Sequence, residues 1–231
     1  MYGASHGLSP DRRLADVPRV AFDEFEASFP PKAPVVVTDL AARWPAYETW
    51  TYASLRERLG LGDEETAQRL SPELERDVVF PPIARAREHA NVWVGRTYVT
   101  QLHYDLPHNL NTVLRGEKEF VLFAPRETKN LYPLSVLHPD GPLNSRVRLD
   151  AIEPRFTRIH RAHYWQVRVG RGQSLYIPPF FWHFVASFGE TVAANVWFHV
   201  EPSRVKRMAR FPRAALGYAA MSLARRALRP R

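Results

Sequence analysis

The stretch that decides the fold is NVWVGRTYVTQLHYD, residues 91–105, in which two short apolar or alternating runs meet at Gly95. Six more runs of this kind follow it, at 109–115, 118–124, 164–169, 174–177, 183–188 and 191–199. Pro, Gly and Asn separate the runs, and no long helical pattern lies between them. About eight short strands in this arrangement predict an antiparallel double-sheet barrel rather than a fold that alternates strands and helices.

The segment before the barrel is predicted to be partly helical. Phenylalanine recurs every three or four residues over 20–29, which indicates a short amphipathic helix. A buried strand is expected at 34–38, and a second helix at 52–59 that ends at Gly60. Residues 60–90 are polar and contain prolines, so we expect connecting structure with one or two helical turns.

Two further segments complete the predicted organisation. Residues 130–160 are rich in Pro and Arg and are expected to form a long surface excursion between the two halves of the barrel. Residues 203–229 are predicted to form a helix, interrupted or restarted at Pro212, with a stripe of Leu and Ala that needs a partner surface. We therefore expect an N-terminal extension, a barrel domain and a basic amphipathic C-terminal helix, at residues 1–16, 17–201 and 202–231.

Composition narrows the possible chemistry. The chain has 231 residues, of which 45% are hydrophobic, so it can bury one sizeable core, and it has no apolar run long enough for a membrane span. Its first residues lack the apolar stretch of a secretory signal, and a cytoplasmic location is expected. The sequence contains no cysteine, which excludes disulfides and thiol chemistry and leaves His, Asp and Glu as the strong metal ligands.

The net charge of +8 is a property of the C-terminal segment. Residues 203–231 hold nine basic groups and no acidic one, whereas the rest of the chain has 23 basic and 24 acidic residues. Such a segment fits a dimerisation helix, a docking surface for an acidic peptide, a nucleic-acid contact or a membrane-surface helix. A homodimer is favoured because the Leu and Ala stripe suits helix packing, and RNA binding stays open.

The candidate site begins with His103 and Asp105. Residues two apart on an extended strand point to the same side, so the imidazole and the carboxylate face one way. A third ligand must come from another strand, and the candidate is His183, at the end of the apolar run LYIPPFFWH. Two imidazoles and one carboxylate on one face of a metal leave its other positions open, which is the arrangement of non-haem Fe(II) oxygenases.

Each of these signals has a structural alternative. The His-x-Asp pattern is weak by itself because short patterns recur by chance, and His183 is also compatible with a partly buried histidine bonded to a backbone carbonyl. Lys118 shares one side of its predicted strand with Phe120 and Leu122, so an ammonium buried there must meet an anion. Its alternative is a lysine at the start of the strand whose side chain extends past the turn to solvent.

Nine sequence features follow one another in a fixed order: Pro34-Val-Val-Val, Trp44-Pro45, Trp50-Thr51, Val92-Trp-Val-Gly95, His103-Tyr-Asp105, Arg115-Gly-Glu-Lys118 with Leu122-Phe-Ala-Pro125, Leu131-Tyr-Pro133, Leu175-Tyr-Ile-Pro178 with Trp182-His183, and Asn195-Val-Trp197. In this order they resemble the JmjC and cupin-like Fe(II)/2-oxoglutarate oxygenases over about residues 17–200. The likeness is to the small hydroxylase branch that includes the asparaginyl hydroxylase of hypoxia-inducible factor.

The resemblance implies a mainly β fold, a double-stranded β-helix of the jelly-roll or cupin-like type. It implies that Fe(II) is held by His103, Asp105 and His183, and that Lys118 pairs with the distal carboxylate of the cosubstrate 2-oxoglutarate. The same likeness places three more side chains near the cosubstrate or the metal: Asn109, Asn195 and Thr100. The implied reaction uses O2 and 2-oxoglutarate to hydroxylate a C–H bond.

This sequence departs from the family pattern in three places, and each departure affects the role of one residue or one turn. Thr100 has the wrong parity to share a face with His103 on a regular strand, so its role requires a bulge or a twist. The family's cosubstrate-binding tyrosine is either Tyr98 or an earlier tyrosine. The family's Pro-Gly-Asp turn is replaced by Arg171-Gly-Gln173, which alters a turn rather than a ligand.

Further histidines and tryptophans receive structural or peripheral roles. His160 and His163 lie three residues apart without a third ligand, so solvent-exposed or substrate-facing roles are expected. His108 and His199 are candidates for lining the substrate cleft. Three tryptophans at element junctions are expected in the core: Trp44, Trp50 and Trp93.

Three functions are compatible with the sequence. The leading hypothesis is an Fe(II)- and 2-oxoglutarate-dependent dioxygenase that hydroxylates a side chain of a peptide or protein, including a ribosomal natural-product precursor. A hydroxylase of a modified tRNA or RNA base is the first alternative, motivated by the basic C-terminal segment. A non-catalytic cupin-like binding module is the least favoured, because three ligands of an open metal site occur together with Lys118.

Overall fold

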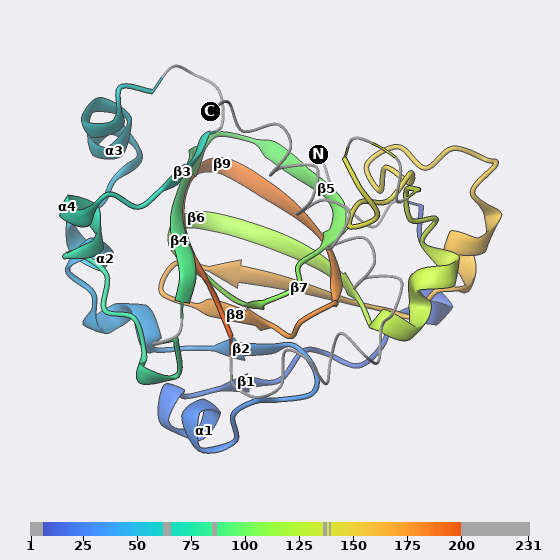
Figure 1. Ribbon diagram of the computed structural model, residues 1–231, viewed down its shortest axis with the longest axis horizontal. Helices are drawn as coiled ribbons and strands as arrows, with labels where there is room; N and C mark the ends of the chain where they lie inside the picture. Colours follow the sequence, from blue (N-terminus) through green and yellow to red (C-terminus); the bar gives the residue numbers. More distant parts are fainter. Residues whose placement is uncertain (1–6, 62–65, 85–86, 136–137, 139, 200–231) are drawn as a thin grey trace, which may run out of the picture.

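The computed structural model describes residues 7–61, 66–84, 87–135, 138 and 140–199, and within them the chain is mainly β (Figure 1). Nine strands are formed: β1 Arg19–Val20, β2 Val35–Val37, β3 Thr66–Arg69, β4 Arg87–Gly95, β5 Tyr98–Tyr104, β6 His108–Phe123, β7 Tyr164–Gly170, β8 Ser174–Ile177 and β9 Trp182–Phe198. The α-helices are α1 Phe22–Ala27, α2 Pro45–Thr49, α3 Tyr52–Leu59 and α4 Pro72–Glu75. Short 3-10 helices lie at Pro10–Arg12, Leu40–Arg43, Pro82–Ala84, Pro125–Asn130 and Thr157–Arg161.

The long strands β6 and β9 organise the barrel, because they pair with each other along almost their whole length. Each contains two of the runs expected as separate strands, joined at a glycine with positive φ. Gly116 has φ 72° in β6 and Gly189 has φ 64° in β9. The pairing register shifts around Arg115, so both strands bend where one sheet passes into the other.

On one side of this bend the strand order is β1-β2-β8-β6-β9-β4-β3, with β1 and β2 parallel and the other pairs antiparallel. On the other side β7 pairs with the second half of β6, and β5 pairs with the first half of β9. Two sheets that share two bent strands form a jelly-roll barrel. The predicted double-stranded β-helix is therefore confirmed.

The N-terminal helices cover the outer face of the first sheet. The buried aromatic side chains of Phe25 and Trp50 pack in one cluster with Leu55 of α3 and Val92 of β4. Helix α3 ends at Gly60, whose φ is 62°, as its sequence predicted. The expected helices at 20–29 and 52–59 and the strand at 34–38 are thus confirmed, with small differences at their ends.

The described part of the segment 130–160 lies on the opposite side of the barrel from helices α2, α3 and α4 (Figure 1). This part is not only a surface excursion, because Leu131, Val147 and Phe156 are buried in a second cluster with Phe123 and Phe184 of the barrel. Backbone hydrogen bonds tie it to β5: Ser145 N–H donates to the carbonyl of Leu102, and Tyr104 N–H donates to that of Leu143. The expected excursion between the two halves is present, but it is partly buried and packs against the barrel beside β5.

Other expectations are met in part. The region 60–90 contains the expected helical turns but also the short edge strand β3, which the sequence did not indicate. The predicted C-terminal helix, 202–231, lies outside the described residues, as does the start of the N-terminal extension. Among the described helices, none has the length and apolar character that crossing a bilayer requires.

Candidate metal centre

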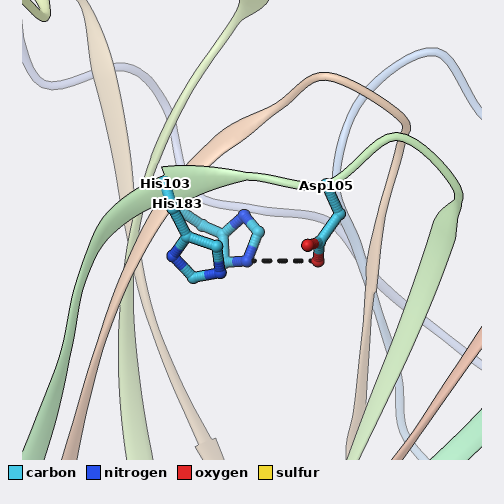
Figure 2. A group of neighbouring side chains, drawn as sticks. All are labelled: His103, Asp105 and His183. Atoms are coloured by element: carbon cyan, nitrogen blue, oxygen red, sulfur yellow. Dashed lines mark ion pairs between the residues drawn. The ribbon is translucent and has the colours of Figure 1, made fainter. Parts of the chain in front are cut away.

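Three ligand-type side chains meet at one end of the barrel. His103 is on β5, Asp105 is the first residue after the end of β5, and His183 is the second residue of β9. His103 and His183 are cross-strand partners, and their ring centroids lie 4.2 Å apart. Figure 2 shows both imidazoles beside the carboxylate, with His183 Nε2 at 3.6 Å from Asp105 Oδ2. The ligand atoms of all three residues lie within 4.8 Å of one another, so the predicted convergence exists.

Backbone carbonyls orient both imidazoles. The Nδ1 of His103 lies 2.7 Å from the carbonyl oxygen of Gln101, and the Nδ1 of His183 lies 3.0 Å from that of Phe181. A carbonyl only accepts, so each Nδ1 carries the proton and each Nε2 keeps its lone pair. Burial, followed by the charge of His103, lowers the pKa of His183 to about 4. The ring is therefore neutral at pH 7, the form that binds a metal.

Asp105 is held from two sides. Its Oδ2 accepts hydrogen bonds from Asn109 Nδ2 at 3.0 Å and from the indole Nε1 of Trp197 at 2.8 Å. Its backbone carbonyl accepts from the N–H of Phe180, which ties the turn before β9 to the end of β5. The sequence did not identify Trp197 as a partner of Asp105, although Trp197 is two residues after Asn195 on β9 and so has the same parity as Asn195.

The donor set fits Fe(II). Two imidazoles and one carboxylate supply nitrogen and oxygen ligands of the kind that non-haem iron takes, with room for further ligands on the cavity side. Among the described residues, this trio is the one group of His, Asp or Glu side chains whose ligand atoms could share an ion. The carbonyl bond expected in the structural alternative for His183 is present, and here it orients the ring toward the other two side chains.

A cavity opens beside these residues. Besides His103, Asp105 and His183, it is lined by Trp93, Thr100, Asn109, Asn111, Lys118, Phe120, Ile177, Val185, Asn195 and Trp197. All four side chains expected near the cosubstrate are among them. Thr100 reaches the cavity because the β5–β9 register shifts between Thr100 and His103, which is the irregularity that its parity required.

Lys118 is buried in this cavity wall, with only 2% of its surface exposed. The alternative of a lysine extended into solvent is therefore wrong. Its Nζ donates to the hydroxyl of Tyr98 at 2.6 Å and lies 5.1 Å from the ring centroid of Tyr98 and 5.5 Å from that of Trp93. These contacts place Tyr98, rather than an earlier tyrosine, beside the lysine.

Ser187 is a buried cross-strand neighbour of Lys118 that the sequence did not single out. Ser187 is 1% exposed and lies on β9, where it pairs with Lys118 of β6 on one side and with Tyr98 of β5 on the other. It is four residues from His183 on the same strand and so has the same parity. Its Oγ has no hydrogen-bond partner among the described residues, and the same holds for Oδ1 of Asn111. A buried hydroxyl beside a buried ammonium is suited to meeting an anionic ligand.

The remaining candidates lie away from the metal centre. His108 is buried in the core with its Nδ1 2.7 Å from the hydroxyl of Tyr176, so it does not line the cleft. His160 is exposed, whereas His163 lies 3.6 Å from Glu127. His199 contacts Glu88 at 3.1 Å and is not part of the cavity wall. Trp44 and Trp50 are buried as predicted, but Trp93 is only half-buried and faces the cavity.

A model of the cupin-like domain matches residues 62–204, which includes every side chain of this centre. The chain belongs to the cupin-like domain family. Its relatives extend this to the JmjC type, so it is a member of the JmjC/cupin family of 2-oxoglutarate oxygenase-like proteins.

Three relatives show how far the likeness reaches. JmjC domain-containing protein D of Dictyostelium discoideum is 29% identical over 140 residues, 52% of this chain and 30% of that protein. Jumonji C domain-containing protein 5 of Drosophila melanogaster is 33% identical over 110 residues, 46% of this chain and 26% of that protein. Lysine-specific demethylase 8 of Danio rerio is 25% identical, with 83% of this chain and 59% of that protein covered. The chain thus spans under a third of the length of the first two.

Proposed function

We propose that this cupin-like chain is an Fe(II)- and 2-oxoglutarate-dependent dioxygenase that hydroxylates a side chain of a peptide or protein. The observation that carries the proposal is that one cavity holds both the His103–Asp105–His183 trio and the buried ammonium of Lys118. A metal centre alone would fit many roles. A metal centre that shares its cavity with a buried cation fits a dicarboxylate cosubstrate bound at both ends.

In this proposal the two ends of the cavity have separate tasks. The Nε2 atoms of His103 and His183 and a carboxylate oxygen of Asp105 hold Fe(II). Lys118 holds the distal carboxylate of 2-oxoglutarate, and the hydroxyls of Tyr98 and Ser187, which lie beside it, add hydrogen bonds. Fe(II) with 2-oxoglutarate and O2 supplies the oxidising power for C–H hydroxylation.

The protein's own contribution is orientation and exclusion of water. The carbonyls of Gln101 and Phe181 keep both imidazoles in the metal-binding tautomer before any ligand arrives. Apolar side chains of Phe120, Ile177 and Val185 line the cavity and limit the water that would compete with the cosubstrate.

A peptide or protein substrate is favoured by the relatives. The relatives include HSPB1-associated protein 1 of Homo sapiens, 27% identical over 69% of this chain, and Lysine-specific demethylase 8, and both names point to proteins as partners or substrates. Hydroxylation and N-demethylation place the same demand on the metal centre, and hydroxylation remains our choice because of the likeness to the hydroxylase branch of the family. The proposed domain limits of 17–201, a cytoplasmic location and a homodimer formed through the C-terminal helix complete the proposal.

The first test is an anaerobic titration of the purified protein with Fe(II) and 2-oxoglutarate. A weak visible charge-transfer band is expected when both are present, and it should disappear when either is omitted. Absence of the band at saturating concentrations would contradict the oxygenase and favour the non-catalytic binding module.

The second test separates the substrate classes. Succinate release is measured aerobically with a peptide pool and with a tRNA pool, each against the background without substrate. Stimulation by peptides with a mass gain of one oxygen atom is expected. Stimulation by tRNA alone would contradict the peptide assignment and support the RNA alternative, and formaldehyde release would indicate demethylation.

A further inference from the structure

A chain of side-chain amides leads from the metal-binding carboxylate to the cavity wall. Asn109 Nδ2 donates to Asp105 Oδ2 at 3.0 Å, and Asn195 Nδ2 donates to Asn109 Oδ1 at 3.2 Å. The Oδ1 of Asn195 in turn accepts from the indole Nε1 of Trp93 at 2.7 Å. Both asparagines are buried and come from different strands, β6 and β9, while Trp93 is on β4.

The first donor of this chain fixes the direction of every bond after it. An indole N–H can only donate, so Asn195 must turn its carbonyl oxygen toward Trp93 and its NH2 toward Asn109. Asn109 then presents its own carbonyl oxygen to Asn195, which leaves its NH2 facing Asp105. In the reversed orientation Asn109 would turn a carbonyl oxygen toward a carboxylate, and both groups are acceptors.

We propose that Trp93 is a positioning residue for the metal-binding carboxylate and that it acts through the Asn195–Asn109 amide pair. The inference rests on the proposed metal centre. It also changes the expected role of the two asparagines: they orient Asp105 in the absence of cosubstrate, in addition to any contact with it. Asn91 offers a second donor to the same oxygen of Asn195, but its Nδ2 lies 3.4 Å away. A hydrogen bond of that length is too weak to replace the bond from the indole fully.

Trp93 is also placed to connect the two ends of the cavity. Its ring centroid lies 5.5 Å from the ammonium of Lys118, while its N–H leads to Asp105 through the amides. A tryptophan at this position therefore serves two purposes: its ring lies near Lys118, and its N–H donates to Asn195. Phenylalanine would keep a ring near Lys118 and remove only the donor, which makes Trp93→Phe the informative change.

The test measures metal affinity rather than turnover. Metal-free protein is titrated anaerobically with Co(II), which substitutes for Fe(II) and has visible absorption bands, without 2-oxoglutarate. We expect Trp93→Phe to bind Co(II) about tenfold more weakly than the wild type, as is usual for loss of an outer-shell partner. Trp197→Phe, which removes a direct donor to Asp105, is expected to weaken binding at least as much.

The chain offers a matched control. Trp44 is buried and its indole N–H has no hydrogen-bond partner among the described residues, so Trp44→Phe makes the same chemical change without breaking a bond. Its Co(II) affinity should equal that of the wild type. The melting temperatures of the metal-free proteins, measured in parallel, confirm that all variants are folded at the temperature of the titration.

A second variant separates positioning from cosubstrate binding. Asn195→Leu breaks the amide chain, so it should weaken Co(II) binding without 2-oxoglutarate present, whereas a residue that only contacts the cosubstrate would leave this affinity unchanged. Wild-type affinity in Trp93→Phe or Asn195→Leu overturns the inference while the metal centre stands. Failure of the wild type to bind Co(II) or Fe(II) overturns the metal centre, and the inference with it.

Discussion

The two ends of the cavity are built on different physical principles. At the metal end, the three ligand side chains are held by neutral groups that each make defined hydrogen bonds: backbone carbonyls for the imidazoles, an amide and an indole for Asp105. At the other end, the ammonium of Lys118 is buried beside the phenol of Tyr98, the ring of Trp93 and the hydroxyl of Ser187, which has no hydrogen-bond partner among the described residues.

This contrast shows where the protein has given up folding stability in favour of ligand binding. The metal end satisfies its polar groups within the protein, so its geometry is set before a ligand arrives. The lysine end places a cation, and a hydroxyl without a partner among the described residues, in a low-dielectric site, which costs folding free energy that an anionic ligand can return on binding. Substitutions at the two ends should therefore differ in how they affect stability and binding.

The largest effect is expected from loss of a metal ligand. His103→Ala or Asp105→Ala should reduce substrate-dependent succinate release below detection, a loss well beyond the about 10–100-fold that follows removal of an outer-shell partner. The circular dichroism spectrum should remain that of a folded β protein. His160→Ala is the control, because it removes an exposed histidine distant from the cavity lining, and turnover retained in either ligand variant would refute the metal assignment.

The next effect tests the lysine end. Lys118→Met keeps an unbranched side chain one heavy atom shorter and removes the charge, so the concentration of 2-oxoglutarate needed for half-maximal turnover should rise about a hundredfold. The metal-free protein should be as stable as the wild type or more stable, because a buried ammonium is costly to desolvate. Both quantities are read from one preparation, by succinate release and by thermal unfolding.

The control for this change is Lys129→Met, which removes an exposed lysine outside the cavity. It should leave the cosubstrate requirement unchanged. If Lys118→Met keeps the wild-type requirement, Lys118 has no role in cosubstrate binding. If it instead unfolds the metal-free protein, the ammonium stabilises the fold and the contrast between the two ends is lost.

The sequence predicts the metal end better than the lysine end, and strand parity explains why. His103 and Asp105 are two residues apart, so their common direction follows from backbone geometry alone. The bulge that brings Thr100 into the cavity was required by parity but could not be located from sequence, because a register shift is fixed by pairing with β9. Ser187 was missed for lack of a pattern, although its four-residue spacing from His183 on one strand was a usable signal.

The fold shows the same division between local and non-local information. Helix α3 follows from a capping threonine, Thr51, and a terminating Gly60, both of which are local signals. Strand β3 is a polar edge strand whose existence depends on pairing with β4, so its sequence alone does not indicate it. The burial of Leu131 and Phe156 likewise depends on the barrel surface that they cover, and their aperiodic spacing gave no sign of it.

The smallest effect expected at the lysine end comes from Ser187→Ala. Loss of one hydrogen bond to a charged ligand should raise the 2-oxoglutarate requirement about tenfold, while the metal-free protein should lose no stability, because the hydroxyl has no partner among the described residues. Ser174→Ala is the reciprocal control: its hydroxyl lies 2.8 Å from that of Thr112, outside the cavity lining, so it should lower the melting temperature and leave the requirement unchanged. Equal stability losses in the two variants would mean that the Ser187 hydroxyl is already hydrogen-bonded in the ligand-free protein, and the distinction between the two ends would then rest on the buried charge of Lys118 alone.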